Sequence, residues 1–390
     1  MASRDDAVYD VIVIGLGAMG SAAAYHLARR GARVLGLDAH APGHTLGSSH
    51  GESRIIRLSY YEHPDYVPLL LRAYELWDIL QQEAEVELLR MTGGLYVGPL
   101  SGSLVAGSLR SAQEHRLPVE VLDAPEIVRR FPVLRPRVDD FAVYEPRAGV
   151  LFCERCIEAH LRLAAAAGAR LRHEEPVHEW HAGHEEHNGG GPVEVRTGAA
   201  VYRATDLVIT AGAWAGRLLA PLGIPLQPER NTVFWLQPQH SAGDFASDRF
   251  PIWIWDAREG GVFYGVPHLE RDGVKVARHH SGIACDPDTV SRVVTAADEA
   301  PVRRFVQSAI PALDGPVADS VACLYTLTPD QHFVIDRHPE HPNVIFACGF
   351  SGHGFKFSSV VGEILADLAT GRPATPAADF LRLARLVPSQ

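Results

Sequence analysis

The first patterned region of the chain is a short apolar run, Val11 to Ile14, followed by a glycine turn and an alanine-rich helical pattern from Ser21 to Arg30. A second apolar run covers residues 33–37. Short apolar runs that end at turn signals are typical of buried strands, whereas the longer alanine-rich pattern is typical of a helix. The order predicts a β-strand, an α-helix and a second β-strand, which is a βαβ unit.

The later chain carries two kinds of pattern. Leucines together with Tyr74 and Trp77 fall on one side of a predicted helix over 66–82. Between residues 221 and 320, prolines, aromatic residues and alternating strands such as Gly261 to Gly265 predominate, which favours an antiparallel sheet inserted into the first domain. The other predicted elements are helices over 153–167, near 301–310 and over 360–369, and strands near 169–171, 207–210 and 344–347.

The predicted fold class is α/β, with an α+β organisation overall. The chain has 390 residues, of which 46% are hydrophobic, and this is enough for two domains with their own cores. One is a Rossmann-like α/β domain built from discontinuous segments, and the other is built on an antiparallel or mixed sheet. The first domain is assigned residues 1–85, 150–220 and 321–390, and the second residues 86–149 and 221–320.

Charge and cysteine content narrow the classes of function. The formal net charge is −11 and no long basic stretch is present, so nucleic-acid binding is not expected. No apolar run approaches the length of a membrane span, and residues 1–10 lack the apolar core of a secretory signal. The five cysteines are few and odd in number, which suits a reducing compartment better than a disulfide framework. The sequence therefore predicts a cytoplasmic enzyme without a membrane partner.

The glycine turn has the spacing of a dinucleotide-binding loop. Gly15 permits a tight turn, Gly17 lets a pyrophosphate approach the backbone, and Gly20 lets helix and strand pack closely. The helix that follows would direct its free N–H groups toward the phosphates. Asp38 ends the second strand, at the distance expected for a carboxylate that binds ribose hydroxyls. An acid at this position argues against the 2′-phosphate of NADP.

Two features carry less information. Residues 173–187 are rich in His and Glu and lead into a glycine turn, which favours a solvated hairpin loop over a metal site because no ligand spacing recurs. Cys153 and Cys156 form a CxxC pair without a second pair, and we interpret them as structural. No metal is predicted.

Four further segments, together with the glycine loop, carry a resemblance to a known family. They are Gly47 to Arg57 (GSSHGESRIIR), Phe263 to Gly265 with Lys275 and His279, Ala322 to Thr326, and Gly349 to Phe357 (GFSGHGFKF). In this order, and over nearly the whole chain, the sequence resembles the monomeric sarcosine oxidase and N-methyltryptophan oxidase family of flavin-dependent amine oxidases. The resemblance implies an FAD-binding domain of discontinuous segments with a mixed-sheet catalytic domain packed over the flavin.

The resemblance also implies that FAD is attached covalently through a cysteine thioether. Cys323 stands at the matching position, and Cys348 is the next candidate. A thiolate is the reactive form of cysteine and can add to the electrophilic form of the flavin methyl group, whereas the residues alone favour a buried structural thiol. The residues expected to bind the cofactor are Gly15, Gly17, Met19, Gly20, Asp38, His50, Arg54, Val177, Cys323, Gly352, His353, Gly354 and Lys356.

Further matches imply roles around the substrate. Lys275 matches a lysine that promotes reaction with O2, because a fixed cation stabilises developing negative charge. Arg57 and Lys356 match cationic partners of a substrate carboxylate, and His279 matches a histidine that contacts the substrate amine. From pattern alone, these side chains could equally be solvated surface charges or outward-facing strand residues. The expected catalytic residues are Lys275, His279, Arg54 and Tyr264, and the expected substrate-binding residues are Arg57, Lys356, Tyr264, Tyr325 and His279.

The implied reaction is the FAD-dependent oxidation of a secondary amine amino acid, with sarcosine as the reference, by O2. The imine product hydrolyses to an amine and an aldehyde, and hydrogen peroxide is released. Trp253 and Trp255 alternate onto one face of a strand, where they could narrow the pocket, line it for a bulkier or cyclic substrate such as N-methyltryptophan or pipecolate, or fill the core. The other hypotheses are an FAD dehydrogenase with a different acceptor, an NAD-dependent dehydrogenase and a non-catalytic flavoprotein. A monomer is the family expectation.

Overall fold

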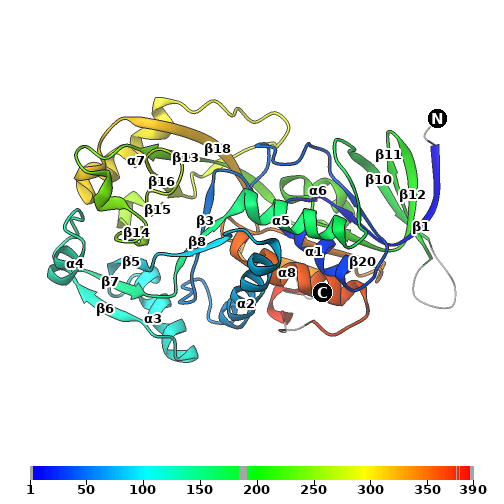
Figure 1. Ribbon diagram of the computed structural model, residues 1–390, viewed down its shortest axis with the longest axis horizontal. Helices are drawn as coiled ribbons and strands as arrows, with labels where there is room; N and C mark the ends of the chain where they lie inside the picture. Colours follow the sequence, from blue (N-terminus) through cyan, green and yellow to red (C-terminus); the bar gives the residue numbers. More distant parts are fainter. Residues whose placement is uncertain (1–2, 184–190, 375, 377, 387–390) are drawn as a thin grey trace.

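The computed structural model describes residues 3–183, 191–374, 376 and 378–386. Two large sheets lie toward opposite ends of its longest axis, and a group of helices lies in the middle of the molecule (Figure 1). The α-helices are α1 (Ala18–Arg29), α2 (Tyr66–Ala84), α3 (Ser103–His115), α4 (Ala124–Arg130), α5 (Cys153–Ala166), α6 (Ala215–Leu218), α7 (Ala296–Ala309) and α8 (Ser358–Ala369).

The first sheet has a parallel centre with antiparallel additions. Its strands are β10 (Val177–Ala182), β11 (Val193–Thr197), β12 (Ala200–Ile209), β1 (Ser3–Ile14), β2 (Val34–Leu37) and β9 (Arg170–Arg172), with β20 (Val344–Cys348) and β19 (Val334–Arg337) joined at β12. β1 pairs in parallel with both β12 and β2. The predicted βαβ unit is therefore confirmed, and the carboxyl ends of β1 and β2 meet at the edge where the glycine loop begins.

Alternating side chains of the central strands bury both faces of this sheet. Val11 and Val13 face a core shared with α1, α2, α5 and α8, whereas Ile12 and Ile14 face a second core shared with β11 and β12. A strand covered on both faces reads as the continuous apolar run seen in the sequence. In Figure 1, α1 and α8 lie next to each other beside β20.

The second sheet combines two distant parts of the chain. Its strands are β17 (Ile283–Ala284), β13 (Gln227–Leu236), β16 (Val274–His279), β15 (Val262–Val266), β14 (Ile252–Asp256), β5 (Gly94–Pro99), β7 (Asp140–Glu145) and β6 (Glu120–Asp123), with the long β18 (Val317–Leu327) paired to β13. Most pairs are antiparallel, but β14 and β5 are parallel, so the sheet is mixed. A third, small sheet consists of β3 (Ser53–Ile56), β8 (Gly149–Phe152) and β4 (Leu89–Met91).

Most predicted elements agree with the structure to within a few residues, but α7 begins earlier than expected. The prediction placed this helix near residues 301–310. In the structure α7 begins at Ala296, because Thr295 and Asp298 form a reciprocal capping box that satisfies the free N–H groups at its start. The predicted strand over 207–210 is likewise the end of the longer β12.

The histidine- and glutamate-rich stretch contributes an ordered strand. Within residues 173–183, β10 pairs in antiparallel fashion with β11, and the rest of the predicted loop, 184–187, lies outside the described residues. Over the described ranges, no group of three or more His, Cys, Asp or Glu residues could hold a metal ion. No helix in the part of the chain that the structure describes has the length and apolar character needed to cross a membrane. The predicted domain boundaries remain predictions.

Candidate active site

The glycine loop after β1 is shaped by close contacts. Gly15 has a φ of +87°, and a Cβ there would lie 2.6 Å from the carbonyl oxygen of Thr210. A Cβ on Gly20 would lie 1.7 Å from the Gly15 carbonyl oxygen, so Gly20 allows α1 to pack against the loop. Gly17 differs, because a Cβ there would meet only Ser49 Oγ, at 3.9 Å. The loop is therefore open to a ligand at Gly17, beside the N-terminus of α1.

Asp38 fixes the loop from the end of β2. Its Oδ2 accepts a hydrogen bond from the Leu16 N–H at 2.6 Å, and its Oδ1 accepts one from the His40 N–H at 2.9 Å. The carboxylate lies on the wall of the same cavity as the loop. Its position is set by two backbone donors rather than by a neighbouring cation, so it presents a negative charge to whatever binds there.

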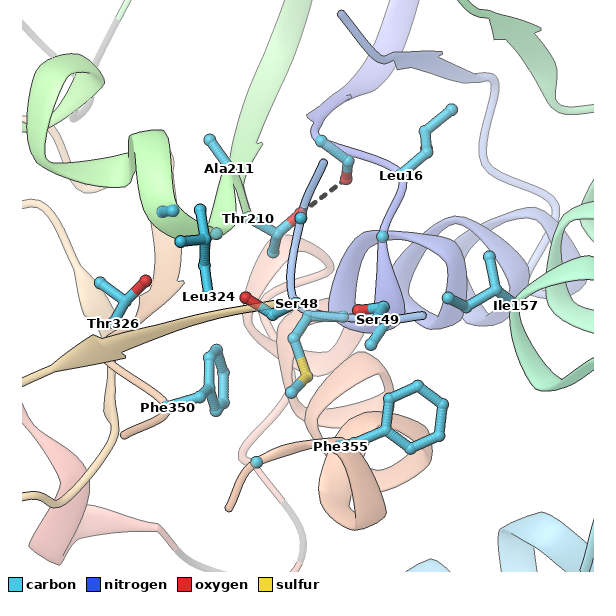
Figure 2. Close-up of a pocket in the computed structure, with 18 of the residues that line it drawn as sticks. Leu16, Ser48, Ser49, Ile157, Thr210, Ala211, Leu324, Thr326, Phe350 and Phe355 are labelled. Atoms are coloured by element: carbon cyan, nitrogen blue, oxygen red, sulfur yellow. Dashed lines mark hydrogen bonds between the residues drawn. The ribbon is translucent and has the colours of Figure 1, made fainter. Parts of the chain in front are cut away.

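A large cavity extends from this loop to the second sheet. Its volume is about 1190 Å³. This exceeds the roughly 300–1,000 Å³ of typical small-molecule pockets, so the cavity has room for a dinucleotide and a further small molecule. Figure 2 shows Leu16, Ser48, Thr210, Leu324 and Phe350 converging on it from separate parts of the chain.

Most of the predicted site residues meet at this cavity. The predicted residues on its wall are Gly15, Gly17, Met19, Asp38, Arg54, Arg57, Val177, Tyr264, His279, Cys323, Tyr325, Gly352, His353, Gly354 and Lys356. Gly20, His50 and Lys275 are buried without lining it.

The residues present fit an FAD molecule. Gly17 leaves the loop open beside the N-terminus of α1, where a pyrophosphate can approach the backbone. Asp38 places a carboxylate on the wall at the end of β2, as the ribose of a dinucleotide requires. The Arg54 guanidinium donates to the Ser53 and Ser48 carbonyls, each at 2.8 Å, and brings a fixed positive charge to the wall. An open glycine loop, a carboxylate and a fixed cation suit a dinucleotide that ends in a polar ring system.

Lys275 is one of only two lysines in the chain, and it is 1% exposed. Its ammonium donates to the Gly51 carbonyl at 2.8 Å and to the Ser53 carbonyl at 2.6 Å, and lies 5.5 Å from the centre of the Trp235 ring. Burial, with a smaller contribution from the positive charge of Arg54, lowers the pKa of Lys275 to about 7. Lys275 therefore changes charge near neutral pH.

Arg57 is buried and already holds a carboxylate. One guanidinium nitrogen, Nη2, donates to both Glu62 carboxylate oxygens, at 2.8 and 2.6 Å, and the other terminal nitrogen, Nη1, donates to the Ser59 carbonyl at 3.1 Å. The rings of Tyr60 and Tyr61 lie 4.2 and 4.7 Å from the guanidinium carbon. The arrangement shows that the buried Arg57 guanidinium can hold a carboxylate on the cavity wall.

Lys356, the second lysine, lies close to Arg57. Its ammonium donates to the His353 carbonyl at 2.7 Å and lies 5.3 Å from the centre of the Tyr60 ring that Arg57 also contacts. Burial, followed by the positive charge of Arg57, lowers the pKa of Lys356 to about 7. Lys356 is therefore only partly charged at neutral pH, and it adds positive charge beside the Arg57–Glu62 ion pair as the pH falls below 7.

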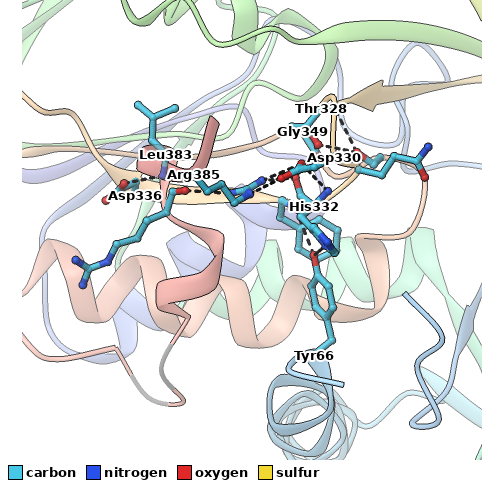
Figure 3. A network of polar contacts seen from close by, with 12 residues as sticks. Tyr66, Thr328, Asp330, His332, Asp336, Gly349, Leu383 and Arg385 are labelled. Atoms are coloured by element: carbon cyan, nitrogen blue, oxygen red, sulfur yellow. Dashed lines mark hydrogen bonds and ion pairs between the residues drawn. The ribbon is translucent and has the colours of Figure 1, made fainter. Parts of the chain in front are cut away.

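The glycine-rich loop between β20 and α8 is held by a polar network (Figure 3). Arg385 forms an ion pair with Asp330 at 2.8 Å and donates to the His332 carbonyl at 2.7 Å. Thr328 donates to the same carbonyl at 2.7 Å, and the ring of His353 faces the Gln331 carbonyl at 2.9 Å. These contacts hold the segment that contains Gln331, whose carbonyl contacts the His353 ring. The His353 carbonyl in turn accepts the hydrogen bond from Lys356.

An aromatic wall comes from three strands of the second sheet. Tyr264 lies on β15, Tyr325 on β18 and His279 on β16, and His279 Nδ1 lies 3.4 Å from the Tyr325 hydroxyl. Burial, followed by the neighbouring His280, holds the pKa of His279 well below its usual range. The His279 imidazole is therefore neutral at neutral pH and can accept a hydrogen bond through its unprotonated ring nitrogen.

The two tryptophans of β14 fill the core and leave the wall to Ile254. Trp253 and Trp255 are 0% and 4% exposed, and both pack against Phe305 of α7, with ring centres 5.4 and 5.7 Å apart. Ile254 points the other way, as alternation along a strand requires, and lies opposite Tyr264 on the cavity wall. Of the three alternatives left open by the sequence, core packing is the one that the structure shows.

Cys323 is the cysteine that faces the cavity. It is 2% exposed, lies on β18 opposite Asn231 of β13, and forms no disulfide. Cys348, the other predicted candidate, packs into a core of the first sheet. All five cysteines belong to the described chain, and Cys323 is the one on the cavity wall.

Several residues of the site escaped the sequence-based prediction. Glu62, which pairs with Arg57, and Ile254, which faces Tyr264, both line the cavity. Glu154 lines it as well, although its CxxC stretch was interpreted as structural. A usable signal existed only for Ile254, because it lies between Trp253 and Trp255 and must point to the opposite face of the strand.

Comparison with known proteins shows the family to which the chain belongs. The family model described as FAD dependent oxidoreductase matches residues 10–368. The chain therefore belongs to the FAD-dependent oxidoreductases, and the predicted α/β fold class and the use of FAD are confirmed.

Curated relatives define the group within that family. The chain is 50% identical over 372 residues to monomeric sarcosine oxidase of Streptomyces avermitilis, which covers 94% of this chain and 95% of the relative. It is 37% identical over 382 residues to N-methyl-L-tryptophan oxidase of Salmonella newport, which covers 97% and 99%. The solved structure of NikD, an unusual amino acid oxidase essential for nikkomycin biosynthesis, is 25% identical, with a TM-score of 0.83 over 96% of this chain and 97% of the other. The chain thus belongs to the monomeric sarcosine oxidase and N-methyltryptophan oxidase family, as its sequence predicted.

Proposed function

We propose that this protein oxidises a small N-methylated α-amino acid, with sarcosine as the reference substrate, by means of FAD and O2. The observation that carries the proposal is the pair of buried cations, Arg57 and Lys356, on the wall of the cavity that begins at the dinucleotide loop. A buried guanidinium fork and a second cation are what a carboxylate needs once it leaves water. The relative at 50% identity carries the matching name, monomeric sarcosine oxidase.

The substrate carboxylate would bind by competing with Glu62. Glu62 occupies the fork of Arg57 in this structure, and its side chain is 14% exposed whereas that of Arg57 is 3% exposed. Glu62 can move toward solvent, but Arg57 is held by the Ser59 carbonyl and by the rings of Tyr60 and Tyr61. The amine would then lie between the carboxylate site and the aromatic wall.

The wall residues would hold the amine in its reactive, neutral form. FAD, when bound, supplies the acceptor for the hydride that leaves the carbon next to the amine nitrogen. Neutral His279, which lies 3.4 Å from the Tyr325 hydroxyl, would accept a hydrogen bond from the amine and add no positive charge that favours its protonation. Tyr264 and Ile254 would close the site around the methyl group and exclude water.

Cys323 is proposed as the covalent anchor of FAD. If so, Cys323→Ser will release the flavin into the supernatant when the protein is precipitated with acid, whereas the wild-type pellet stays yellow. Cys348→Ser is the matched control, because Cys348 is also a buried free thiol but lies in a core of the first sheet. If the flavin stays bound to the acid-precipitated Cys323→Ser protein, another residue is the covalent anchor.

The function is tested by release of hydrogen peroxide from the purified protein. Sarcosine, N-methyltryptophan, pipecolate and proline form the test set, and turnover is expected to be highest with sarcosine because the relative at 50% identity is named monomeric sarcosine oxidase. If turnover is highest with a cyclic or aromatic substrate, the proposed substrate class is wrong. If substrate bleaches the flavin but no peroxide forms, O2 is not the electron acceptor. Peroxide as product, a cytoplasmic location and a monomeric state are predictions that belong to the same proposal.

A further inference from the structure

A strained turn precedes β3, directly in front of Lys275. Gly51 and Glu52 both have left-handed backbones, with φ values of +92° and +69°. Such a conformation costs a residue other than glycine roughly 1–2 kcal/mol, so surrounding contacts must hold Glu52 in place. The turn makes hydrogen bonds on two sides, to Glu154 on one and to Lys275 on the other.

One side of the turn faces Glu154, in the first turn of α5. A single oxygen, Oε1 of Glu154, accepts hydrogen bonds from the Gly51 N–H at 2.7 Å and from the Glu52 N–H at 3.1 Å. The Glu52 carboxylate is held separately, by the Arg271 N–H at 2.7 Å and the Trp235 indole N–H at 3.3 Å. These contacts satisfy the donors of the turn and offset its strain.

The other side of the turn faces Lys275, whose ammonium binds the Gly51 and Ser53 carbonyls. The Gly51 carbonyl and the Glu52 N–H belong to one planar peptide group, in which the two point in opposite directions. Glu154 therefore holds this peptide group by its N–H while Lys275 binds its oxygen. A negative acceptor at the N–H polarises the group and makes its oxygen a better partner for a cation.

We propose that Glu154 is a positioning residue for Lys275, and that it acts through the Gly51–Glu52 peptide group. Glu154 needs no contact with substrate for this role. The inference rests on the proposed function only where it concerns O2, since the placement of Lys275 can be observed directly. Without Glu154, the turn loses two hydrogen bonds at once, and the carbonyls that hold Lys275 lose their fixed direction.

The chain offers an unusually direct test, because Lys275 and Lys356 are its only lysines. Biosynthetic incorporation of [ε-¹³C]lysine into the FAD-loaded protein gives one NMR signal for each, and Lys275→Met identifies which is which. In Glu154→Ala, the Lys275 signal is expected to shift and to titrate at lower pH, while the Lys356 signal stays in place. The reaction with O2 at pH 7 is expected to slow about tenfold, while bleaching of the flavin by substrate changes little.

Glu126→Ala is the matched control, since Glu126 is also an acid in the first turn of a helix, α4, but lies away from the cavity. An unchanged Lys275 signal in Glu154→Ala, or an equal change in Glu126→Ala, overturns the inference. If Glu154→Ala does not fold, Glu154→Gln keeps a weaker acceptor and is expected to shift the Lys275 signal in the same direction by less; an unmoved signal overturns the inference. A displaced Lys275 signal with an unchanged O2 reaction supports the positioning role and instead removes Lys275 from the proposed O2 chemistry.

Discussion

Lys275→Met is expected to slow the reaction of the substrate-reduced enzyme with O2 by about a hundredfold to a thousandfold, and to leave reduction by substrate within a few-fold of the wild type. The ammonium is buried and held by two carbonyls, so water cannot replace its charge once it is removed. Stopped-flow spectroscopy separates the two steps, because bleaching of the flavin can be followed without O2 and its return can be followed after mixing with O2.

The same lysine predicts a pH dependence of the O2 step. The pKa of Lys275 is lowered to about 7, chiefly by burial, so the cation is present below that pH and is lost as the pH rises through it. The wild-type rate with O2 is therefore expected to fall above pH 7, and the rate of Lys275→Met is expected to be flat. Arg271→Met is the control, because Arg271 is a cation near the same Trp235 ring, at 4.4 Å, but is 37% exposed and paired with Asp319. Equal slowing of both steps by Lys275→Met would contradict the role.

The glycine loop shows what spacing alone can predict. The strand, turn, helix and acid were all placed correctly, because backbone dihedrals and close packing restrict those positions to few residue types. The spacing also predicted separate roles for the glycines, and the geometry agrees: Gly20 allows the loop and α1 to pack, while Gly17 leaves an open face to the cavity. The spacing could not predict which distant residues surround the loop. Thr210 lies against Gly15 and Gly20, and Ser49 is the residue nearest to a Cβ on Gly17.

The partners of the charged residues could not be predicted from the sequence. Arg57 was identified by resemblance, but its ion pair with Glu62 depends on how the chain turns between β3 and α2. Glu154 was assigned to a structural CxxC stretch, and its contact with the Gly51–Glu52 turn spans about a hundred residues of sequence. Periodicity describes one element at a time, whereas these contacts join elements that only the tertiary fold brings together.

Arg57→Met is expected to raise the KM for an amino acid substrate by about a hundredfold, which corresponds to roughly 3 kcal/mol, with a smaller effect on kcat. The Arg57 guanidinium, which already holds the Glu62 carboxylate, is a permanent cation, whereas burial lowers the pKa of Lys356 to about 7, so that Lys356 alone is only partly charged at neutral pH. Steady-state kinetics with sarcosine measures the change. Because the substitution leaves Glu62 without its partner, the double variant Arg57→Met with Glu62→Gln removes the cost of that unpaired carboxylate.

A substrate without a carboxylate shows whether Arg57 binds the substrate carboxylate or only maintains the shape of the site. For the methyl ester of sarcosine, wild type and Arg57→Met should have similar kcat/KM values, since the ester offers no negative charge for the guanidinium to bind. Equal losses for sarcosine and its ester would show that Arg57 supports the shape of the site, through the Tyr60 and Tyr61 rings that pack on it, rather than the substrate carboxylate. Only a loss confined to the free acid assigns the two cations to the carboxylate, and that assignment is what makes an amino acid, rather than a simple amine, the substrate.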